Sequence, residues 1–296
     1  MTRLLVTGGS GFLGRHILAR AGRENWQLAL TSRDPLAVTG LPAGTEAVTA
    51  LLSDPASLAS ALAVVRPDVV VHAAAVVDDA HPDLWAVNVD GTRNLLGALE
   101  ACTPMPRLVH VSTFAVEDTP PTAYSESKQA AEELVRASRV PFVIVRPSLV
   151  YGPGDGTNTP RLVERLAEGR HWIPGGGVAR IQPVYVGDAA SAIVAAATCE
   201  AALGQTYRLG GPEPLRVCDY RAAVRDASGG SAAIKALPLP LFGLAARLLA
   251  LAGKSGPLGQ LRFHQADHAV DIEATRRDLG FAPRSLAEGL AMTFGG

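Results

Sequence analysis

The chain has 296 residues, of which 48% are hydrophobic and 19% are charged, and its formal net charge is −1. This size allows a large core in one bilobed unit or in two closely joined domains, and the balanced charge argues against a nucleic-acid partner. Cys102, Cys199 and Cys218 have neither metal-site nor redox spacing, so we expect reduced thiols in a cytoplasmic protein. A strand is expected from about Arg3, which leaves no room for a signal peptide.

The N-terminal residues predict a strand, a glycine-rich turn and a helix. An apolar run at residues 4–6 precedes the turn, and an amphipathic stretch at 12–21 follows it. The spacing Gly9-x-Gly11-x-x-Gly14 is typical of dinucleotide-binding turns. Such glycines allow a tight turn, a close approach of backbone to a pyrophosphate and close helix–strand packing, while the helix N-terminus offers N–H groups to the phosphates. The alternative is an ordinary strand–helix turn rich in glycine.

Strand-like and helix-like segments alternate through the first half of the chain. We expect strands at residues 3–7, 27–31, 47–50, 69–72, 108–112 and 142–145, and helices at 12–21, 55–65, 83–101 and 124–138. Several of the strands are continuous apolar runs, which is typical of strands buried on both faces of a parallel sheet. The alternation predicts an α/β fold with a doubly wound parallel sheet, a Rossmann fold, and right-handed crossovers.

One predicted helix contains a candidate acid–base pair. Tyr124 and Lys128 are four residues apart and would share one face of the helix. An ammonium near a phenol lowers the phenol pKa from about 10, which makes Tyr124 a candidate general acid or base. The preceding strand ends at Ser112 and Thr113, whose hydroxyls could hold a substrate oxygen beside Tyr124. The alternatives are a helix-surface pair and a simple hydroxyl cap at the end of a strand.

Beyond residue 156 the segments become shorter and richer in proline and glycine. We expect a coenzyme-binding domain at 1–156, with later returns near 178–200, and a smaller interleaved substrate-binding lobe at 157–296. The most apolar stretch, 236–252, is too short and too interrupted to span a membrane. We interpret residues 237–252 as a helix in the core or lid of the lobe, with an apolar substrate wall or a membrane-touching patch as the alternative.

Ordered motifs along almost the whole chain resemble one family. They lie at residues 7–14, 71–75, 88–96, 112–113, 124–132, 146–154 and 184–190, with a further match at 279–284. Together they resemble the extended short-chain dehydrogenases/reductases, also called the epimerase/dehydratase family. The resemblance implies a Rossmann fold with a C-terminal substrate lobe and an enzyme that uses NAD(P).

The resemblance also implies which residues bind the coenzyme. The glycines would cradle the pyrophosphate, Phe12 and Leu13 would donate backbone N–H groups, and the turn after Arg146 would pack on the nicotinamide. The implied binding set is Gly8, Gly11, Phe12, Leu13, Gly14, Leu52, Ala73, Ala74, Lys128, Pro147 and Ser148.

For catalysis, the resemblance implies that Tyr124 exchanges a proton with the substrate oxygen. Lys128 would hold the nicotinamide ribose and favour ionisation of Tyr124, and Thr113, rather than Ser112, would orient the substrate. Two further polar residues are interpreted as structural. Asn88 would brace neighbouring strands rather than touch substrate, and His72 would sit at the end of a buried strand rather than act as a base.

The end of the second strand bears on coenzyme choice. Members that use NAD tend to have an acidic residue where Thr31 stands, whereas Arg33 resembles the arginine that meets the 2′-phosphate of NADP. Asp34 is the competing candidate for NAD, but its place before Pro35 is typical of a turn. Arg15 is either a helper or a solvated helix residue. We therefore expect NADP(H) to be favoured over NAD(H).

Departures from the family pattern bear on the substrate. Sugar-nucleotide epimerases usually have Asn where Leu149 stands, although Arg180, Arg208 and Arg262 could still supply charge for a diphosphate. The favoured function is an NADP(H)-dependent oxidoreductase acting on a carbonyl or a secondary alcohol. The alternatives are an NAD(P)-dependent sugar-nucleotide epimerase or dehydratase and, in another class, a non-catalytic nucleotide-sensing protein.

The expected partner is a small-molecule substrate, without nucleic acid and without an integral membrane span. The resemblance implies a homodimer formed through helices at 83–101 and 122–138. His264, Asp267 and His268 were weighed as a metal site, but no further ligand pattern accompanies them, so we expect no metal.

Overall fold

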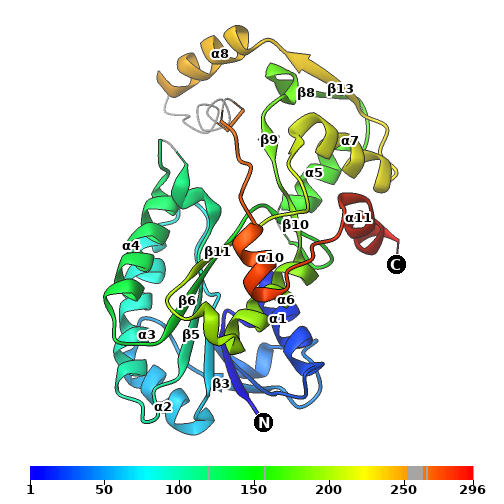
Figure 1. Cartoon of the computed structure of the whole chain (residues 1–296). Coiled ribbons are helices and arrows are strands. Elements are labelled where there is room, and N and C mark those ends of the chain that lie inside the picture. Colours follow the sequence, from blue (N-terminus) through cyan, green and yellow to red (C-terminus); the bar gives the residue numbers. More distant parts are fainter. Residues whose placement is uncertain (119, 157, 252–262, 265, 296) are drawn as a thin grey trace. The chain divides into compact units, whose positions relative to one another are not determined.

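The computed structural model describes residues 1–118, 120–156, 158–251, 263–264 and 266–295 (Figure 1). The chain forms two compact units, which are described separately. Unit 1 comprises Met1–Ser148, Val186–Leu209 and Asp271–Ala282. Unit 2 comprises Leu149–Tyr185, Gly210–Val270 and Pro283–Gly296.

Unit 1 is built on a seven-stranded parallel sheet. Its strands are β1 (Arg3–Thr7), β2 (Gln27–Ser32), β3 (Glu46–Thr49), β4 (Val69–His72), β5 (Arg107–Val111), β6 (Phe142–Pro147) and β11 (Thr206–Leu209). Their order across the sheet is β11-β6-β5-β4-β1-β2-β3. The order reverses at β1, whose neighbours are β2 and β4, with Thr7 in register with both Thr31 and His72. Ligands of open α/β sheets bind at this reversal, beyond the carboxyl ends of the strands.

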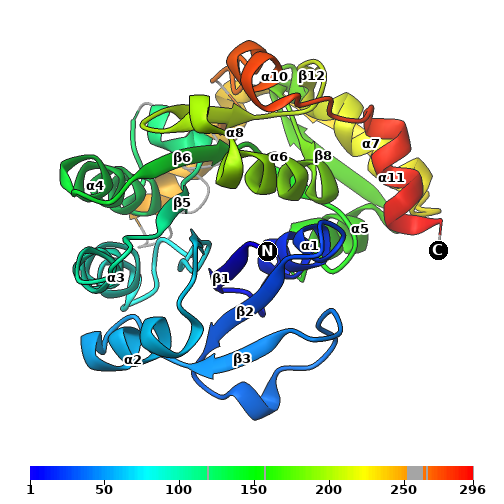
Figure 2. The same ribbon diagram turned by 60° about the horizontal axis from the view of Figure 1, so that its bottom comes forward.

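Helices cover both faces of the sheet. Figure 2 shows α1 (Phe12–Gly22) and α6 (Val186–Thr198) on one side, and α2 (Pro55–Val65), α3 (Gly91–Glu100) and α4 (Ala123–Ala137) on the other. A short helix, α10 (Glu273–Leu279), packs on α6 and β11. The predicted doubly wound Rossmann fold is therefore confirmed.

The core of unit 1 explains why the sheet strands are so apolar. Leu5, Val70, Leu108 and Ile144 lie on four adjacent strands and are buried in one cluster with the inner faces of α2 and α3. Because helices cover both faces of the sheet, the consecutive residues 69–71 are all buried. Each such side chain contributes roughly 1.5–3 kcal/mol of hydrophobic stabilisation.

Local signals set most element ends, and one helix differs from the prediction. Helix α2 runs from Pro55 to Val65 as predicted, because the Asp54 carboxylate accepts a hydrogen bond from the N–H of Ala56 at 3.0 Å. The helix expected at 83–101 instead contains a π-helical turn, Ala86–Asp90, before α3 begins. A Cβ on Gly91, the first residue of α3, would lie 2.9 Å from the Leu52 Cβ, so the absence of a side chain lets α3 approach the loop after β3.

Unit 2 consists of short strands and helices. Strands β8 (Arg170–Pro174) and β13 (Ala233–Leu237) pair in parallel, as do β7 (Val150–Tyr151) and β10 (Val184–Tyr185). Strands β9 (Arg180–Ile181) and β12 (Leu215–Arg216) pair antiparallel. Helix α7 (Val217–Ala227) packs against α5 (Asn158–Leu166) and α11 (Leu286–Phe294). These elements are brief because proline and glycine interrupt the chain so often.

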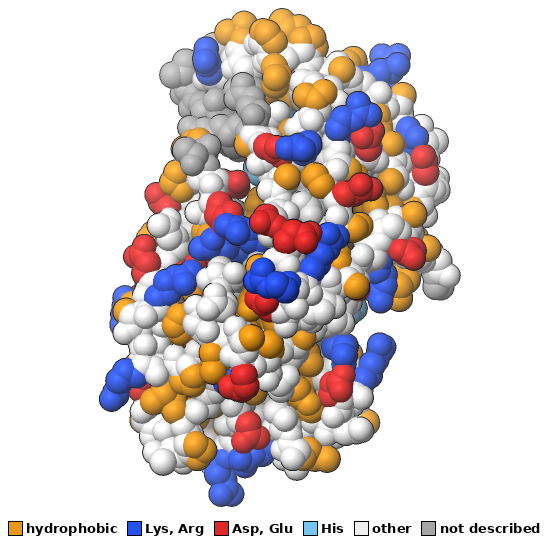
Figure 3. All heavy atoms as spheres, viewed as in Figure 1, with side chains coloured by type: hydrophobic (Ala, Val, Ile, Leu, Met, Phe, Trp, Pro, Cys, Tyr) orange, Lys and Arg blue, Asp and Glu red, His pale blue; other side chains and the backbone are white. Residues whose placement is uncertain are grey.

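The apolar segment forms helix α8 (Leu239–Leu251), and Ala252 lies outside the described residues. Ala246 is buried, whereas Leu241 and Leu244 are 62% and 59% exposed. Figure 3 shows hydrophobic side chains gathered over this part of unit 2, while charges of both signs are interspersed elsewhere on the face shown. Only part of α8 therefore serves as core. None of the helices in the described ranges combines the length and apolarity needed to cross a membrane.

Candidate coenzyme and catalytic site

The glycine-rich turn after β1 has the geometry of a phosphate cradle. Gly8 has a positive φ of 72°, and a Cβ there would lie 2.7 Å from the backbone nitrogen of Ala74. A Cβ on Gly14 would lie 2.2 Å from the Gly8 carbonyl oxygen. The N–H of Gly11 donates to that same carbonyl at 3.0 Å and closes the turn. Only glycine suits these positions, because a side chain at Gly8 would strain its left-handed backbone and meet the loop after β4, and one at Gly14 would push the helix away from the turn.

Helix α1 begins directly after this turn with its first N–H groups unsatisfied by any cap. Gly11 is the N-cap residue and supplies no side chain, and the first turn contains no acidic residue. Phe12 and Leu13 are therefore the first helical residues, and no side-chain cap accepts from their N–H groups. The turn and the helix start fit the pyrophosphate of a dinucleotide. Gly9, in contrast, packs against Leu30 of β2 rather than lining the turn.

The loop after β4 lies against the same turn, because the backbone of Ala73 and Ala74 packs on Gly8. His72 just before it is held on both sides of its ring. Nδ1 is 2.6 Å from the Thr7 hydroxyl, and Nε2 is 3.1 Å from the Thr92 hydroxyl. Burial, reinforced by the charge of Lys128, lowers the pKa of His72 to about 3. His72 is thus a neutral brace between β1 and α3, in agreement with its structural interpretation.

The residues at the end of β2 have distinct roles. Asp34 caps the 3₁₀ turn Pro35–Ala37 by accepting from the N–H of Leu36 at 3.1 Å, so it is the turn residue that its position before Pro35 predicted. Arg33 is exposed and forms no ion pair with any residue in the described part of the chain. Its guanidinium therefore remains available for an external anion.

Arg15 has a structural task instead. Its Nε donates to the Ser10 carbonyl at 2.8 Å, and its Nη1 donates to the carbonyls of Thr39 and Gly40 at 2.5 and 3.2 Å. The guanidinium thereby links the phosphate turn to the loop after β2. Neither of the two roles considered from the sequence, helper or solvated residue, includes this link.

Leu52 follows β3 and packs beside the start of α3. Its side chain contacts Gly91, and its carbonyl oxygen accepts a hydrogen bond from Asn94 Nδ2 at 2.8 Å. The residue is partly buried. These contacts fix the loop between β3 and α2 to the edge of the helical layer.

Tyr124 lies in the first turn of α4 with two polar neighbours. Its N–H donates to Asp79 Oδ1 at 2.7 Å, which fixes the start of the helix to the loop after β4. Burial raises the pKa of the Tyr124 phenol, the Thr113 hydroxyl lowers it, and the Asp79 carboxylate raises it again, so that the net pKa lies above its ordinary value. The structure brings Tyr124 and Thr113 together as expected. The phenol is held neutral, which differs from the expected bias toward ionisation.

Thr113 and Ser112 occupy the end of β5. The Thr113 hydroxyl accepts from the N–H of Ala115 at 3.3 Å and caps the 3₁₀ turn Phe114–Glu117. The Ser112 hydroxyl is buried beside the Glu132 carboxylate, whose pKa it helps to lower, and the Ser112 backbone N–H donates to the Val145 carbonyl at 2.7 Å. Both hydroxyls sit at the carboxyl edge of the sheet, where the family pattern implies substrate contact.

Lys128 is almost completely buried, one turn beyond Tyr124 on α4. Burial lowers the pKa of its ammonium to about 8, while the Glu132 carboxylate partly opposes that shift. The Lys128 charge in turn helps to lower the pKa values of His72 and His110. Burial in this environment disfavours the charged form of Lys128. A polar ligand that binds beside the ammonium would stabilise the charged form.

A network of arginine and glutamate side chains connects α4 to strand β6. Arg146 Nε and Nη2 donate to the two oxygens of Glu132 at 2.8 and 2.7 Å, and Arg146 Nη1 pairs with Glu117 at 2.5 Å. Arg136 and Arg208 extend the network to Glu132 and Glu117. Although burial of Glu132 opposes ionisation, the bonds from Arg146 hold its pKa below the usual value. The sequence motif contained Glu132 and Arg146, but it did not predict their pairing.

Other predicted residues are placed as follows. β6 ends at Pro147, and the N–H of the buried Ser148 donates to the Leu209 carbonyl at 2.8 Å. Asn88 exchanges hydrogen bonds with the backbone of Val76 at 2.8 and 2.9 Å and donates to Ser127 Oγ at 3.0 Å. Asn88 therefore links the loop after β4 to α4, rather than bracing neighbouring strands as predicted.

Two of the arginines considered for a diphosphate are already paired. Arg180 pairs with Asp267, and Arg208 pairs with Glu117, while Arg262 lies outside the described residues. His268 Nε2 is 3.0 Å from the Phe263 carbonyl oxygen. Within the described ranges, no group of three metal-ligating side chains converges. Cys102, Cys199 and Cys218 are free thiols.

Comparisons with known proteins agree with this geometry. The model of the NAD dependent epimerase/dehydratase family matches residues 4–210. The chain is similar to 2-alkyl-3-oxoalkanoate reductase from Stenotrophomonas maltophilia, with 30% identity covering 97% of each chain. It is also similar to a 4-hydroxy-2-methyl-3-oxo-4-farnesyl-3,4-dihydroquinoline-1-oxide ketoreductase from Stigmatella aurantiaca, with 27% identity covering 95% of this chain and 92% of the relative.

Among solved structures, the chain resembles UDP-glucose 4-epimerase from Thermus thermophilus in complex with NAD. The TM-score is 0.76 and the identity 25%, with 99% of this chain and 98% of the other covered. The sequence match and the phosphate cradle at the sheet reversal agree. This chain belongs to the NAD-dependent epimerase/dehydratase family, whose members are NAD(P)-dependent reductases, epimerases and dehydratases.

Proposed function

We propose that this protein is an NADP(H)-dependent oxidoreductase that reduces a carbonyl group, or oxidises the matching secondary alcohol, with Tyr124 as the acid–base residue. The observation that supports this best is the neutral phenol of Tyr124 beside the Thr113 hydroxyl. A phenol that keeps its proton is suited to donate it to a carbonyl oxygen.

The coenzyme, when bound, supplies the hydride, and the protein supplies orientation and the proton. The glycine turn and the start of α1 would hold the pyrophosphate, and Lys128 would bind the ribose beside the nicotinamide. Thr113 would orient the substrate oxygen, and Tyr124 would donate its phenolic proton to that oxygen. Tyr124 would then regain a proton from solvent.

The preference for NADP(H) is supported by Arg33. Its guanidinium has no intramolecular ion pair among the described residues, and Asp34, the competing acid, is engaged in capping a turn. A planar guanidinium binds a phosphate through two parallel hydrogen bonds. A 2′-phosphate would therefore be attracted rather than repelled at the end of β2.

Carbonyl reduction is favoured over sugar-nucleotide chemistry by the similarity to known reductases. Both relatives described above that match nearly the full chain are named for reduction, one as a reductase and one as a ketoreductase. Net consumption of NADPH, rather than return of the hydride to the same substrate, is the expected outcome.

A substrate screen tests the proposal. The purified protein is incubated with NADPH and a panel of ketones, and mass spectrometry detects any alcohol formed. Tyr124→Phe should lower kcat by about 10²–10⁴-fold while binding NADPH normally, because only the proton donor is lost. Retention of coenzyme through purification, with interconversion of a UDP-sugar and no net oxidation, would refute the proposal in favour of an epimerase.

We further propose a homodimer formed through the faces of α3 and α4. Trp85, which precedes the π-helical turn before α3, is 47% exposed, as an interface residue would be in an isolated chain. Light scattering coupled to size-exclusion chromatography should give twice the chain mass, and Trp85→Glu should shift the protein toward monomer.

A further inference from the structure

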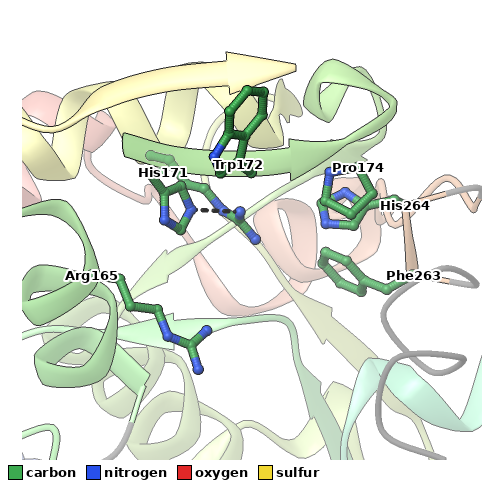
Figure 4. Close-up of a pocket in the computed structure, with 7 residues that line it drawn as sticks. Arg165, His171, Trp172, Pro174, Phe263 and His264 are labelled. Carbon is green, nitrogen blue, oxygen red and sulfur yellow. Dashed lines mark hydrogen bonds between the residues drawn. The ribbon is translucent and has the colours of Figure 1, made fainter. Parts of the chain in front are cut away.

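Unit 2 contains two adjoining cavities with an unusual lining. Their volumes are about 280 and 270 Å³, and both are lined by Arg165, His171, Arg221 and Phe263. In Figure 4, Arg165 comes from α5 and His171 and Trp172 come from β8, with Phe263 and His264 on another side of the cavity. All of these residues belong to unit 2. The cavities are therefore features of this unit alone.

The polar part of the lining is cationic. Arg161 and Arg165 are four residues apart on α5 and so share one face of the helix. Arg221 Nη1 donates to His171 Nε2 at 2.8 Å, which requires that this ring nitrogen be an unprotonated acceptor (dashed line in Figure 4). Burial is the largest cause of the lowered pKa values of Arg221 and His171. The nearby charge of Arg165 lowers both pKa values further.

These charges have no counter-ion among the residues that the structure describes. No carboxylate lines either cavity among the described residues, and Arg161, Arg165 and Arg221 form no ion pair there. His264 also lines the first cavity, and its Nδ1 is buried without a hydrogen-bond partner in the described part of the chain. Holding like charges close together, and leaving a buried donor or acceptor without a hydrogen bond, costs free energy. A bound anion that pairs with these groups would offset that cost.

The remainder of the lining is apolar. Leu162, Ile181 and Val217 border the second cavity, and Trp172 and Pro174 border the first. A fully polar ligand would leave these surfaces without favourable contacts, whereas an alkyl or ring skeleton would bury against them. The lining thus combines a charged end with an apolar wall.

From this arrangement we propose that the cavities of unit 2 bind an amphiphilic carboxylate, its anionic group held by Arg161, Arg165 and Arg221 and its carbon skeleton packed against the apolar wall. The guanidinium groups would bind the carboxylate by charge-assisted hydrogen bonds.

Isothermal titration calorimetry on the full chain tests the site without requiring turnover. The probes are octanoate, 1-octanol, which has the same alkyl chain without the charge, and UDP. Octanoate should bind at least about tenfold more tightly than 1-octanol, because only octanoate pairs with the arginines. Equal affinity of the two would overturn the proposal, and so would UDP binding more tightly than octanoate.

Variants localise the binding. Arg161→Met and Arg165→Met remove exposed guanidinium groups from the lining and should each weaken octanoate by about tenfold while leaving 1-octanol unchanged. Arg170→Met is the matched control, because Arg170 is an exposed arginine of β8 outside the lining. Octanoate affinity that is unaffected by both α5 variants, or equally reduced by the control, would contradict the site.

The outcome is separable from that of the proposed function. If octanoate binds as described but no ketone oxidises NADPH, the anion site stands and the reductase proposal falls. If ketones are reduced but octanoate does not bind as described, the reductase proposal stands and the anion site falls.

Discussion

Arg146 grips the buried Glu132 carboxylate with two parallel hydrogen bonds, from Nε at 2.8 Å and from Nη2 at 2.7 Å. Glu132 lies one turn beyond Lys128 on α4, and Arg146 is the penultimate residue of β6. The pair therefore fixes the helix that holds Tyr124 and Lys128 to the central sheet.

Glu132→Gln should destabilise the protein by about 3 kcal/mol, because it leaves a partly buried guanidinium short of one partner. Chemical denaturation at pH 7 measures the loss. Asp90→Asn, which breaks the exposed pair with Arg93, is the control and should change stability by no more than about 0.5 kcal/mol. Because the folded-state pKa of Glu132 is below its usual 4.5, its contribution is present above pH 4.5 and is lost as the pH falls below that value. A variant as stable as the wild type at pH 7 would contradict this assignment.

Lys128 should limit activity at alkaline pH. Its pKa is lowered from 10.5 to about 8, so kcat/KM should fall as the pH rises through about 8 if the ammonium is required. Between pH 8 and 10.5 the unfolded chain binds the extra proton, so this group makes the protein more stable as the pH rises. A pH profile of kcat/KM, together with denaturation at pH 7 and 9.5, measures both effects.

Lys128→Met separates the two roles of this lysine. Removing a buried charge should raise stability at pH 7 by up to about 3 kcal/mol, the equivalent of the lowered pKa. Activity should fall by about 100-fold or more, because the coenzyme ribose would lose its proposed contact with the ammonium. A destabilised variant would show that the ammonium has a compensating partner.

Arg33→Ala should change the preference between NADPH and NADH without abolishing catalytic activity. The ratio of kcat/KM for NADPH to that for NADH should fall by at least about tenfold, since the charge-assisted bonds to the 2′-phosphate are lost. Arg15→Ala is the contrasting variant, because its donors are occupied by backbone carbonyls. It should weaken both coenzymes alike. An unchanged ratio in Arg33→Ala would mean that another residue reads the 2′-position.

Gly14→Ala and Gly97→Ala place the same methyl group in two helices with opposite expected results. At Gly14 the Cβ would lie 2.2 Å from the Gly8 carbonyl oxygen, so the turn must open. Coenzyme affinity should fall at least about tenfold and stability by about 1–3 kcal/mol. Around Gly97, in α3, nothing lies within 4 Å of the added Cβ, and stability should rise by about 0.5–1 kcal/mol. Coenzyme titration and thermal denaturation of both variants decide the matter.

Much of unit 1 could be predicted from sequence because its signals are local. Apolar runs defined the strands, and Asp54 with Pro55 marked the start of α2. The π-helical turn before α3 could not be predicted in this way, since it depends on how Gly91 meets Leu52 across the layer. Position along the chain showed which residues were polar and close in sequence, but not which were buried.

The electrostatics of the site depended on that burial. The four-residue spacing suggested that Lys128 would promote ionisation of Tyr124, but desolvation dominates and raises the pKa of the phenol. Asp79, which fixes the start of α4, is 45 residues away from Tyr124, so no local pattern could indicate it. Similarly, nothing in the spacing of Arg161, Arg165 and Arg221 revealed that they share adjoining cavities.

The clasp made by Arg15 has a consequence for redesign. One guanidinium joins Ser10 in the phosphate turn to Thr39 and Gly40 in the loop that begins near Arg33. Transplanting that loop to switch the enzyme between nicotinamide coenzymes would also loosen the turn beneath the pyrophosphate. Coenzyme selectivity and coenzyme affinity are thus expected to be coupled through Arg15. A replacement loop must keep the carbonyl groups of positions 39 and 40 within hydrogen-bonding distance of this arginine.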